Sequence, residues 1–311
     1  MRFELKRSVH GGTGRRHDGS RLALLKSPAS VLRVVVLTVV CGTVSRASDF
    51  GPRSGTVRTL RHAPASTTST VVQESADVSR LREAATRGDS EAQFKLALLY
   101  MAGDSVVQDF GKAVDWWRHA AEQGHAAAQF NLGVAYGNGI GVGQDYAQAV
   151  QWYRKAAEQR HAGAQLNLGL SYMRGNGVPR DSAEAVAWYR KAADQGSAGA
   201  QFNLGFMYYR GAGVAQDFAQ ASQWFAKAAE QGIADAQSNL GSMYASGRGV
   251  PQDYVEAHKW LSIAAAGETG QEQQQYAEAR DAVAAVMTRS QIAEAQKRAQ
   301  EWQDSFQRRK N

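Results

Sequence analysis

The chain of 311 residues is 43% hydrophobic, which suits one or two globular domains or a single elongated array. Its formal net charge is +7, but residues 1–47 hold nine of the 36 Lys and Arg residues and only two of the 29 Asp and Glu residues. Beyond residue 47 the number of Lys and Arg residues equals the number of Asp and Glu residues. We therefore expect no nucleic-acid partner, because the body of the protein has no net positive field to attract phosphates.

Residues 1–47 have the features of a signal peptide. Basic residues precede the apolar run Val34–Val40, and Ser45-Arg46-Ala47 places small residues at the two positions that a signal peptidase inspects. The run is too short for a bilayer-spanning helix, which needs roughly 20 apolar residues. We expect cleavage after Ala47, export to the periplasm or cell envelope, and no integral membrane span in the mature chain.

Two alternatives remain for the leader: it could stay uncleaved as an anchor, or Cys41 could be lipidated. Thr38-Val39-Val40 fits poorly before a lipoprotein cysteine. Cleavage after Ala47 would leave a mature chain without cysteine, and so without disulfides or thiolate chemistry. Residues 48–76 are rich in Ser and Thr and predict a flexible, disordered linker.

From residue 77 onward the sequence repeats with a period of 36 residues. Ala-Gln, a Tyr, an Asp, a Trp and an Ala-Ala pair each recur in five copies, and the Trp register is Trp116, Trp152, Trp188, Trp224 and Trp260. A period of this size predicts a solenoid of stacked helical hairpins. The predicted copies are 92–127, 128–163, 164–199, 200–235 and 236–267. They follow a half repeat at 77–91 and precede capping helices within 268–311, at about 271–287 and 289–306.

Each copy predicts two helices around a glycine-rich turn. Gly133 interrupts the first helix of the second copy, which indicates a close helix crossing. Asp145 is placed to cap the second helix, with Gln148 completing a capping-box-like pair. Glycine ends most second helices, but Arg160 stands there in the second copy, which leaves a different turn open.

The segment AQFNLGVAYGNGIGVGQDYAQAVQWYRKAAEQRH resembles the Sel-like repeat family, which is related to the tetratricopeptide repeats, and the ending MTRSQIAEAQKRAQEW is similar to tails of bacterial members. The resemblance implies an all-α fold: a right-handed α/α superhelix of five hairpins with the half repeat and capping helices at its ends. It also implies a scaffold or adaptor in protein complexes. Exported bacterial members of this family are linked to envelope assembly, exopolysaccharide export and host interaction.

The stretch GNGIGVGQD, residues 137–145, resembles a phosphate-binding loop but fits a turn better. Only Gly139 and Gly141 recur in other copies, where a positive φ is the expected need. No Lys-Ser/Thr follows the loop, and Asp145 occupies the helix N-terminus that a phosphate would need. We therefore expect no nucleotide or other cofactor.

Other residue types also favour structural roles. The tryptophans are expected to pack between hairpins rather than stack on sugars or bases. His125 and His161 share one register, but successive hairpins are too far apart for both to bind one zinc ion, so we expect capping or solvated histidines and no metal. No nucleophile or acid–base motif stands out, so we expect no enzyme.

The candidate binding surface is one face of the first helices, where the copies agree in shape but differ in chemistry. In related superhelices this face lines the concave groove. The predicted protein-binding residues are Lys95, Leu99, Asn131, Ala135, Asn138, Asn167, Ser171, Arg174, Asn203, Met207, Arg210, Asn239, Met243 and Ser246. Asn amides can bond a peptide backbone, and Arg174 with Arg210 can bind a carboxylate. The alternative is that these positions are only solvated, or that Asn bonds within the repeat.

The sequence thus predicts a non-enzymatic scaffold or adaptor of the bacterial cell envelope that binds a protein or peptide along the concave face. The alternative is a periplasmic cell-wall-active enzyme or a host-interaction factor built on the repeats. An enzyme should concentrate pattern-breaking titratable residues at one spot. The departures Lys95, Arg160 and His258 are scattered instead, which favours the scaffold.

Overall fold

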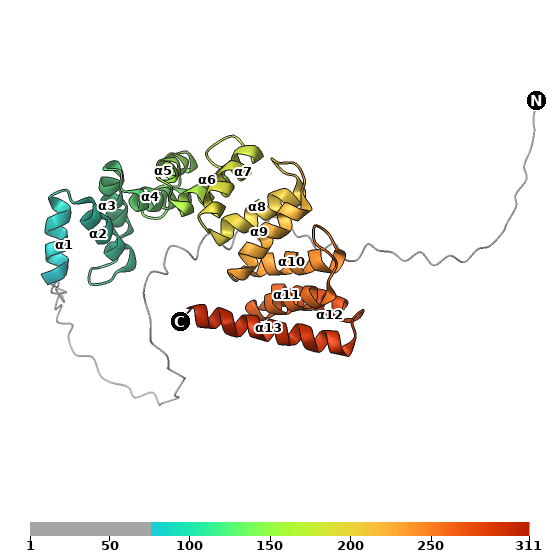
Figure 1. Cartoon of the computed structure of the whole chain (residues 1–311). Coiled ribbons are helices and arrows are strands. Elements are labelled where there is room, and N and C mark those ends of the chain that lie inside the picture. Colours follow the sequence, from blue (N-terminus) through green and yellow to red (C-terminus); the bar gives the residue numbers. More distant parts are fainter. Residues whose placement is uncertain (1–75, 311) are drawn as a thin grey trace, which may run out of the picture.

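The computed structural model describes residues 76–310, and the helices in that range form an all-α solenoid, as expected (Figure 1). The expected signal peptide 1–47, and the linker up to residue 75, lie outside the described residues. The helices are α1 (Ala76–Thr86), α2 (Ser90–Ala102), α3 (Phe110–Glu122), α4 (Ala126–Asn138), α5 (Tyr146–Glu158), α6 (Ala162–Arg174), α7 (Ser182–Asp194), α8 (Ala198–Arg210), α9 (Phe218–Glu230), α10 (Ala234–Ser246), α11 (Tyr254–Gly267), α12 (Gly270–Ala284) and α13 (Arg289–Lys310).

Five hairpins, α2/α3 to α10/α11, stack one after another, and Figure 1 shows them in an arc. We call α2, α4, α6, α8 and α10 the first helices, and α3, α5, α7, α9 and α11 the second helices. Each helix of this array packs against the helices before and after it in the chain. The buried side chains form a series of clusters along the junctions between helices rather than one central core. Each hairpin therefore depends on its neighbours to bury its apolar faces.

A glycine in the middle of the first helix lets the second helix approach closely. A Cβ atom at Gly169 of α6 would lie 2.7 Å from the ring of Tyr189 in α7, and Gly133 has the same relation to Tyr153. The predicted close crossing is confirmed. Burial of these hydroxyls raises the pKa of Tyr153 to about 12 and also raises the pKa of Tyr189.

The turn between the two helices uses two glycines for two reasons. Gly139 ends α4 at φ +70, and Gly141 also has φ +70, so the predicted left-handed backbone is confirmed. At Gly141 a side chain is excluded as well, because a Cβ atom would overlap the carbonyl group of Phe110 at the start of α3. The turn therefore packs against the preceding hairpin.

Asp145 begins α5, as predicted: its Oδ1 accepts the backbone N–H of Gln148 at 2.9 Å. The expected capping box is wrong in its second half. The backbone N–H of Asp145 donates to the carbonyl oxygen of Tyr136 at 2.9 Å, so it is not available to the Gln148 side chain. The same backbone bond joins Asp181 to Tyr172 in the next hairpin. It ties the end of each first helix to the start of the second.

A buried glutamine near the start of each first helix bonds the preceding helix, and in four of the five copies it connects three helices; Gln237 of α10 donates to the carbonyl oxygen of Ala229 but has Gly267 where a second glutamine would stand. Nε2 of Gln165 in α6 donates to the carbonyl oxygen of Ala157 in the last turn of α5, at 3.0 Å. Its Oε1 accepts from Nε2 of Gln195, which ends α7, at 2.6 Å. Equivalent pairs of bonds are made by Gln93, Gln129 and Gln201. We call this series the glutamine ladder. It satisfies carbonyl groups at helix ends, where the regular helical pattern stops.

The C-terminal helices leave the repeat pattern. α12 packs against α11, and α13 also packs against α11 rather than against α12 (Figure 1). On α13, Ala295 and Ala299 are buried. Trp302 on the same face is half-buried. α13 therefore turns back over the last hairpin instead of extending the stack.

Candidate functional site

The structure divides the predicted protein-binding residues into buried and exposed sets. The buried residues are Asn131, Ala135, Asn167, Ser171, Met207 and Met243. The half-buried residues are Leu99, Asn203 and Asn239. The exposed residues are Lys95, Asn138, Arg174, Arg210 and Ser246. The buried residues are a correction to the predicted binding surface, because a partner cannot reach them, and the exposed set is what the first helices offer to a partner.

The buried members of the stripe face the neighbouring hairpin. Ala135 is 1% exposed and belongs to a cluster with Val114 and Trp117 of α3. The side chain of Asn167 hydrogen-bonds the hydroxyl group of Tyr153, which lies in the preceding hairpin. This asparagine thus bonds inside the stack, which is the alternative that the sequence left open.

Arg174 and Arg210 end the first helices α6 and α8 at equivalent positions, and both are exposed. Arg210 lies over the ring of Phe206, 5.5 Å from its centroid. Within residues 76–310 neither arginine forms an ion pair with a carboxylate. Both guanidinium groups complement the helix dipole, and they remain able to form bidentate bonds with a carboxylate from outside the described chain.

The histidines singled out by the sequence cap helices. Nδ1 of His161 accepts the backbone N–H of Ala164 at 3.2 Å, and His125 caps α4 in the same way. Burial lowers the pKa of His161 and so favours the neutral ring that can accept this bond. The expectation of capping histidines is confirmed for this pair.

The tryptophans pack between hairpins, as expected. Trp188 of α7 contacts a cluster formed by α5 and α6. Nζ of Lys191 lies 3.8 Å from the centroid of the Trp188 ring, and Lys155 has the same relation to Trp152 at 4.0 Å. A lysine on the ring face adds a favourable cation–π contact. Half-buried tryptophan rings that each carry a lysine, Trp152, Trp188 and Trp224, therefore follow three consecutive second helices.

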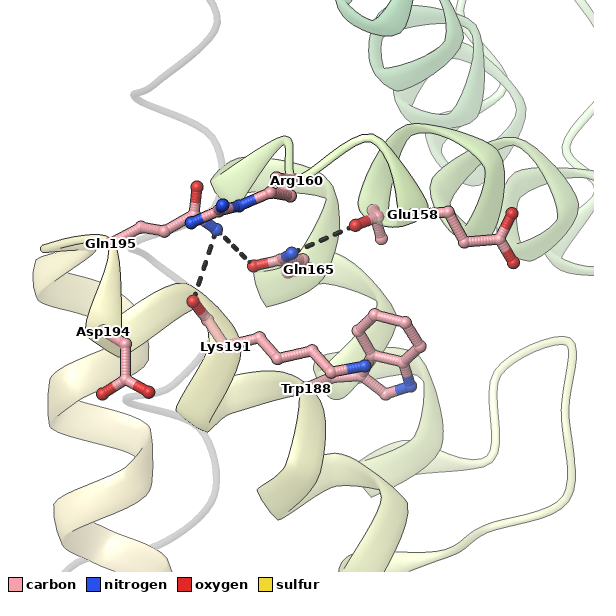
Figure 2. Close-up of a pocket in the computed structure, with 8 residues that line it drawn as sticks. Glu158, Arg160, Gln165, Trp188, Lys191, Asp194 and Gln195 are labelled. Atoms are coloured by element: carbon pink, nitrogen blue, oxygen red, sulfur yellow. Dashed lines mark hydrogen bonds between the residues drawn. The ribbon is translucent and has the colours of Figure 1, made fainter.

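A pocket of about 520 Å³ lies between the C-terminal turns of α5 and α7 (Figure 2). We call it the α5/α7 pocket, and its lining residues are Ala157, Glu158, Arg160, Gln165, Trp188, Lys191, Asp194 and Gln195. Figure 2 shows Arg160 beside Gln195 at one side and Lys191 extending along Trp188 at the other. The pocket thus offers an aromatic ring, charged groups of both signs and two amides of the glutamine ladder. Such a lining can bind a protein side chain that has both apolar and polar parts.

Arg160 is strained at the edge of this pocket. Its φ is +64, whereas Gly124, Gly196 and Gly232 occupy the equivalent position in other copies. The turn does not differ: the Arg160 N–H donates to the carbonyl oxygen of Ala157 at 3.0 Å, as the equivalent glycines do in their hairpins. A left-handed backbone costs a non-glycine residue about 1 kcal/mol. Strain retained beside a pocket is a feature of binding sites.

The sequence reasoning missed both the glutamine ladder and the α5/α7 pocket. The signal for the ladder is a polar Gln that recurs in register beside an invariant Ala. The signal for the pocket is Arg160, which breaks the glycine register.

Within residues 76–310, no helix combines the length and apolar character needed to cross a bilayer. The described part of the chain also holds no group of three or more His, Cys, Asp or Glu side chains able to bind a metal ion.

Comparison with known proteins places these hairpins in a family. The Sel1 repeat model matches residues 90–125, 126–161, 162–197, 198–233 and 234–268. The chain is similar to the crystal structure of c5321, a protective antigen of uropathogenic Escherichia coli strains with an SLR fold. That match has 33% identity and a TM-score of 0.61 over 73% of this chain, and it spans 56% of the antigen. A Sel1 repeat protein from Oxalobacter formigenes matches at 34% identity and a TM-score of 0.58, over 64% of this chain and 87% of its own. No curated protein matches.

The strain at Arg160 predicts a stabilising substitution. Arg160→Gly should raise the free energy of unfolding by about 1 kcal/mol, because glycine adopts φ +64 without a Cβ clash. Urea denaturation followed by circular dichroism measures the change. The matched variant Gly196→Ala, at φ +88 with no atom near its added Cβ, should lose a similar amount. Equal stability of all three proteins would show that the turn carries no strain.

Proposed function

The chain belongs to the Sel1 repeat family, and we propose that it is a non-enzymatic scaffold or adaptor that binds a protein or peptide partner. Sel1 repeat proteins are generally protein-interaction scaffolds. Repeat arrays of this kind offer long surfaces on which each copy can carry different chemistry. In this chain the exposed end of the first helix reads Asn138, Arg174, Arg210 and Ser246 across consecutive copies.

We infer that the partner is held along the exposed side of the first helices, which the family resemblance expects to be concave. The observation that carries this proposal is the pair Arg174 and Arg210. They occupy one register in adjacent hairpins, are exposed, and have no carboxylate partner within residues 76–310. Two guanidinium groups in series favour a segment with acidic residues or a free C-terminal carboxylate.

We also propose that the protein works in the bacterial cell envelope. This part of the proposal rests on the leader 1–47, with its basic residues, apolar run and small residues before Ser48.

The arginine pair gives the first test. Arg174→Ala combined with Arg210→Ala should reduce partner recovery by roughly tenfold for each arginine, because each removes a charge-assisted bond. Crosslinking and quantitative mass spectrometry of envelope extracts measures recovery against the wild-type chain. Helicity and melting temperature should stay unchanged, because neither side chain is buried.

Arg289→Ala combined with Arg308→Ala is the matched control, since it removes the same charge from exposed positions on α13. The same proteins recovered in the same amounts with all three chains would show that the partner does not use the first helices.

The leader gives the second test. N-terminal sequencing of the protein purified from a bacterial host should find a mature chain that starts at Ser48, and fractionation should place it in the envelope. An intact leader on protein in the cytoplasmic fraction would contradict the proposed location.

A further inference from the structure

α13 shows how a helix docks onto the second helices of this solenoid. The indole N–H of Trp302 donates to Glu230 at the end of α9 at 2.8 Å, and its ring meets Trp260 of α11 edge to face at 5.8 Å. Phe306 stacks on Trp302 and lies over Gly232, where a Cβ atom would be 2.6 Å from its ring. α13 therefore fills the junction between two successive second helices with an aromatic pair one turn apart.

The α5/α7 pocket lies at the junction between second helices that is equivalent to the α9/α11 junction under α13, but two repeats earlier in the chain. Glu158 and Trp188 occupy the positions that Glu230 and Trp260 have beneath α13. Trp188 is half-buried, whereas Trp260 is only 4% exposed. The pocket thus keeps the groups that hold α13, a carboxylate for an indole N–H and a tryptophan ring for an aromatic side chain. No helix among residues 76–310 fills it.

Four lining residues make this pocket different from the junction that α13 occupies, and two of them are Asp194 and Gln195 in place of Ala266 and Gly267. The other two are Arg160 at the position of Gly232 and Lys191 at the position of Ile263. An aromatic ring placed as Phe306 is would collide with the Arg160 side chain, since even a Cβ atom is too close there. Arg160 and Lys191 also each add a cation to the surface that would face a docked helix.

We propose that the α5/α7 pocket binds a helix of a partner protein that resembles α13 but carries a carboxylate where α13 has Phe306. The partner helix has an aromatic residue one turn before this carboxylate. The aromatic ring packs on Trp188 and its N–H or O–H group donates a hydrogen bond to Glu158, while the carboxylate forms an ion pair with Arg160. Glu158 and Asp194 together balance the charges of Arg160 and Lys191 in the pocket lining, so the partner's carboxylate is selected by its ion pair with Arg160 rather than by the net charge of the pocket.

This inference rests on the proposed scaffold function but uses the second helices, away from Arg174 and Arg210. A second copy of this chain is not the expected occupant, because its α13 would bring Phe306 against Arg160. The junction with Gly196, where an added Cβ meets no atom, would suit such a copy better.

The probes are two fluorescein-labelled peptides of residues 289–310, one with the natural sequence and one with Phe306→Glu. Fluorescence anisotropy measures their binding to the full chain. The Phe306→Glu peptide should bind the wild-type chain about tenfold more tightly than the natural peptide, because it gains a charge-assisted pair with Arg160. Arg160→Gly should reverse the preference. The control Arg180→Gly, an exposed arginine outside the pocket, should leave it unchanged.

A photo-crosslinker at the Gln303 position of the peptide locates the site, and it should label α5 or α7 rather than α9 or α11. The proposal is overturned if neither peptide binds the folded chain, if binding ignores Arg160, or if the crosslinks map to α9 and α11. It is also overturned if the wild-type chain alone dimerises through this pocket. None of these outcomes bears on the Arg174 and Arg210 test, so the two proposals can fail separately.

Discussion

The hydrogen bonds of one buried glutamine per hairpin fix how each hairpin sits on the one before it. Gln165 donates to the last turn of α5 and accepts from the residue that ends α7, so a single amide sets the relative position of three helices. Gln165 is only 3% exposed. A slip between hairpins would leave buried polar groups unpaired, which costs about 1–3 kcal/mol for each group. The ladder therefore specifies register more than it adds net stability.

A fixed register has a consequence for function, because it repeats every surface position at a regular interval. The ladder, the aspartate caps and the turn glycines are nearly the same in every copy. The residue type can then differ between copies only at positions whose side chains do not pack between hairpins. On the first helices those positions include Arg174 and Arg210. On the opposite set of positions they include Lys191 of α7 and Arg160 in the turn after α5, which line a junction whose equivalent two repeats later is filled by α13. A scaffold of this design can hold different partners on two sides without changing its frame.

The sequence predicts features that depend on a few neighbouring residues, such as turns and helix caps. It does not predict which face of a helix packs against the next hairpin. The period, the positive φ at Gly139 and Gly141 and the cap at Asp145 all follow from the chemistry of a few neighbouring residues. The binding stripe does not, because residues on one helical face can point either at solvent or at the next hairpin. Small or apolar residues at Ala135 and Met207 were the available sign of burial. The ladder is hidden for a related reason: the partner of Gln165 is a backbone carbonyl of another helix, which has no sequence signature.

The ladder is tested most directly by Gln165→Met, which keeps the side-chain volume but removes both hydrogen bonds. Native-state hydrogen exchange read by mass spectrometry compares it with Gln151→Met, an exposed position on α5. The account predicts a loss of about 1–3 kcal/mol of protection at the end of α5, the start of α6 and the end of α7, with distant hairpins and the control unchanged. Equal protection in the two variants would contradict the claim that the glutamine ladder holds the hairpins in register.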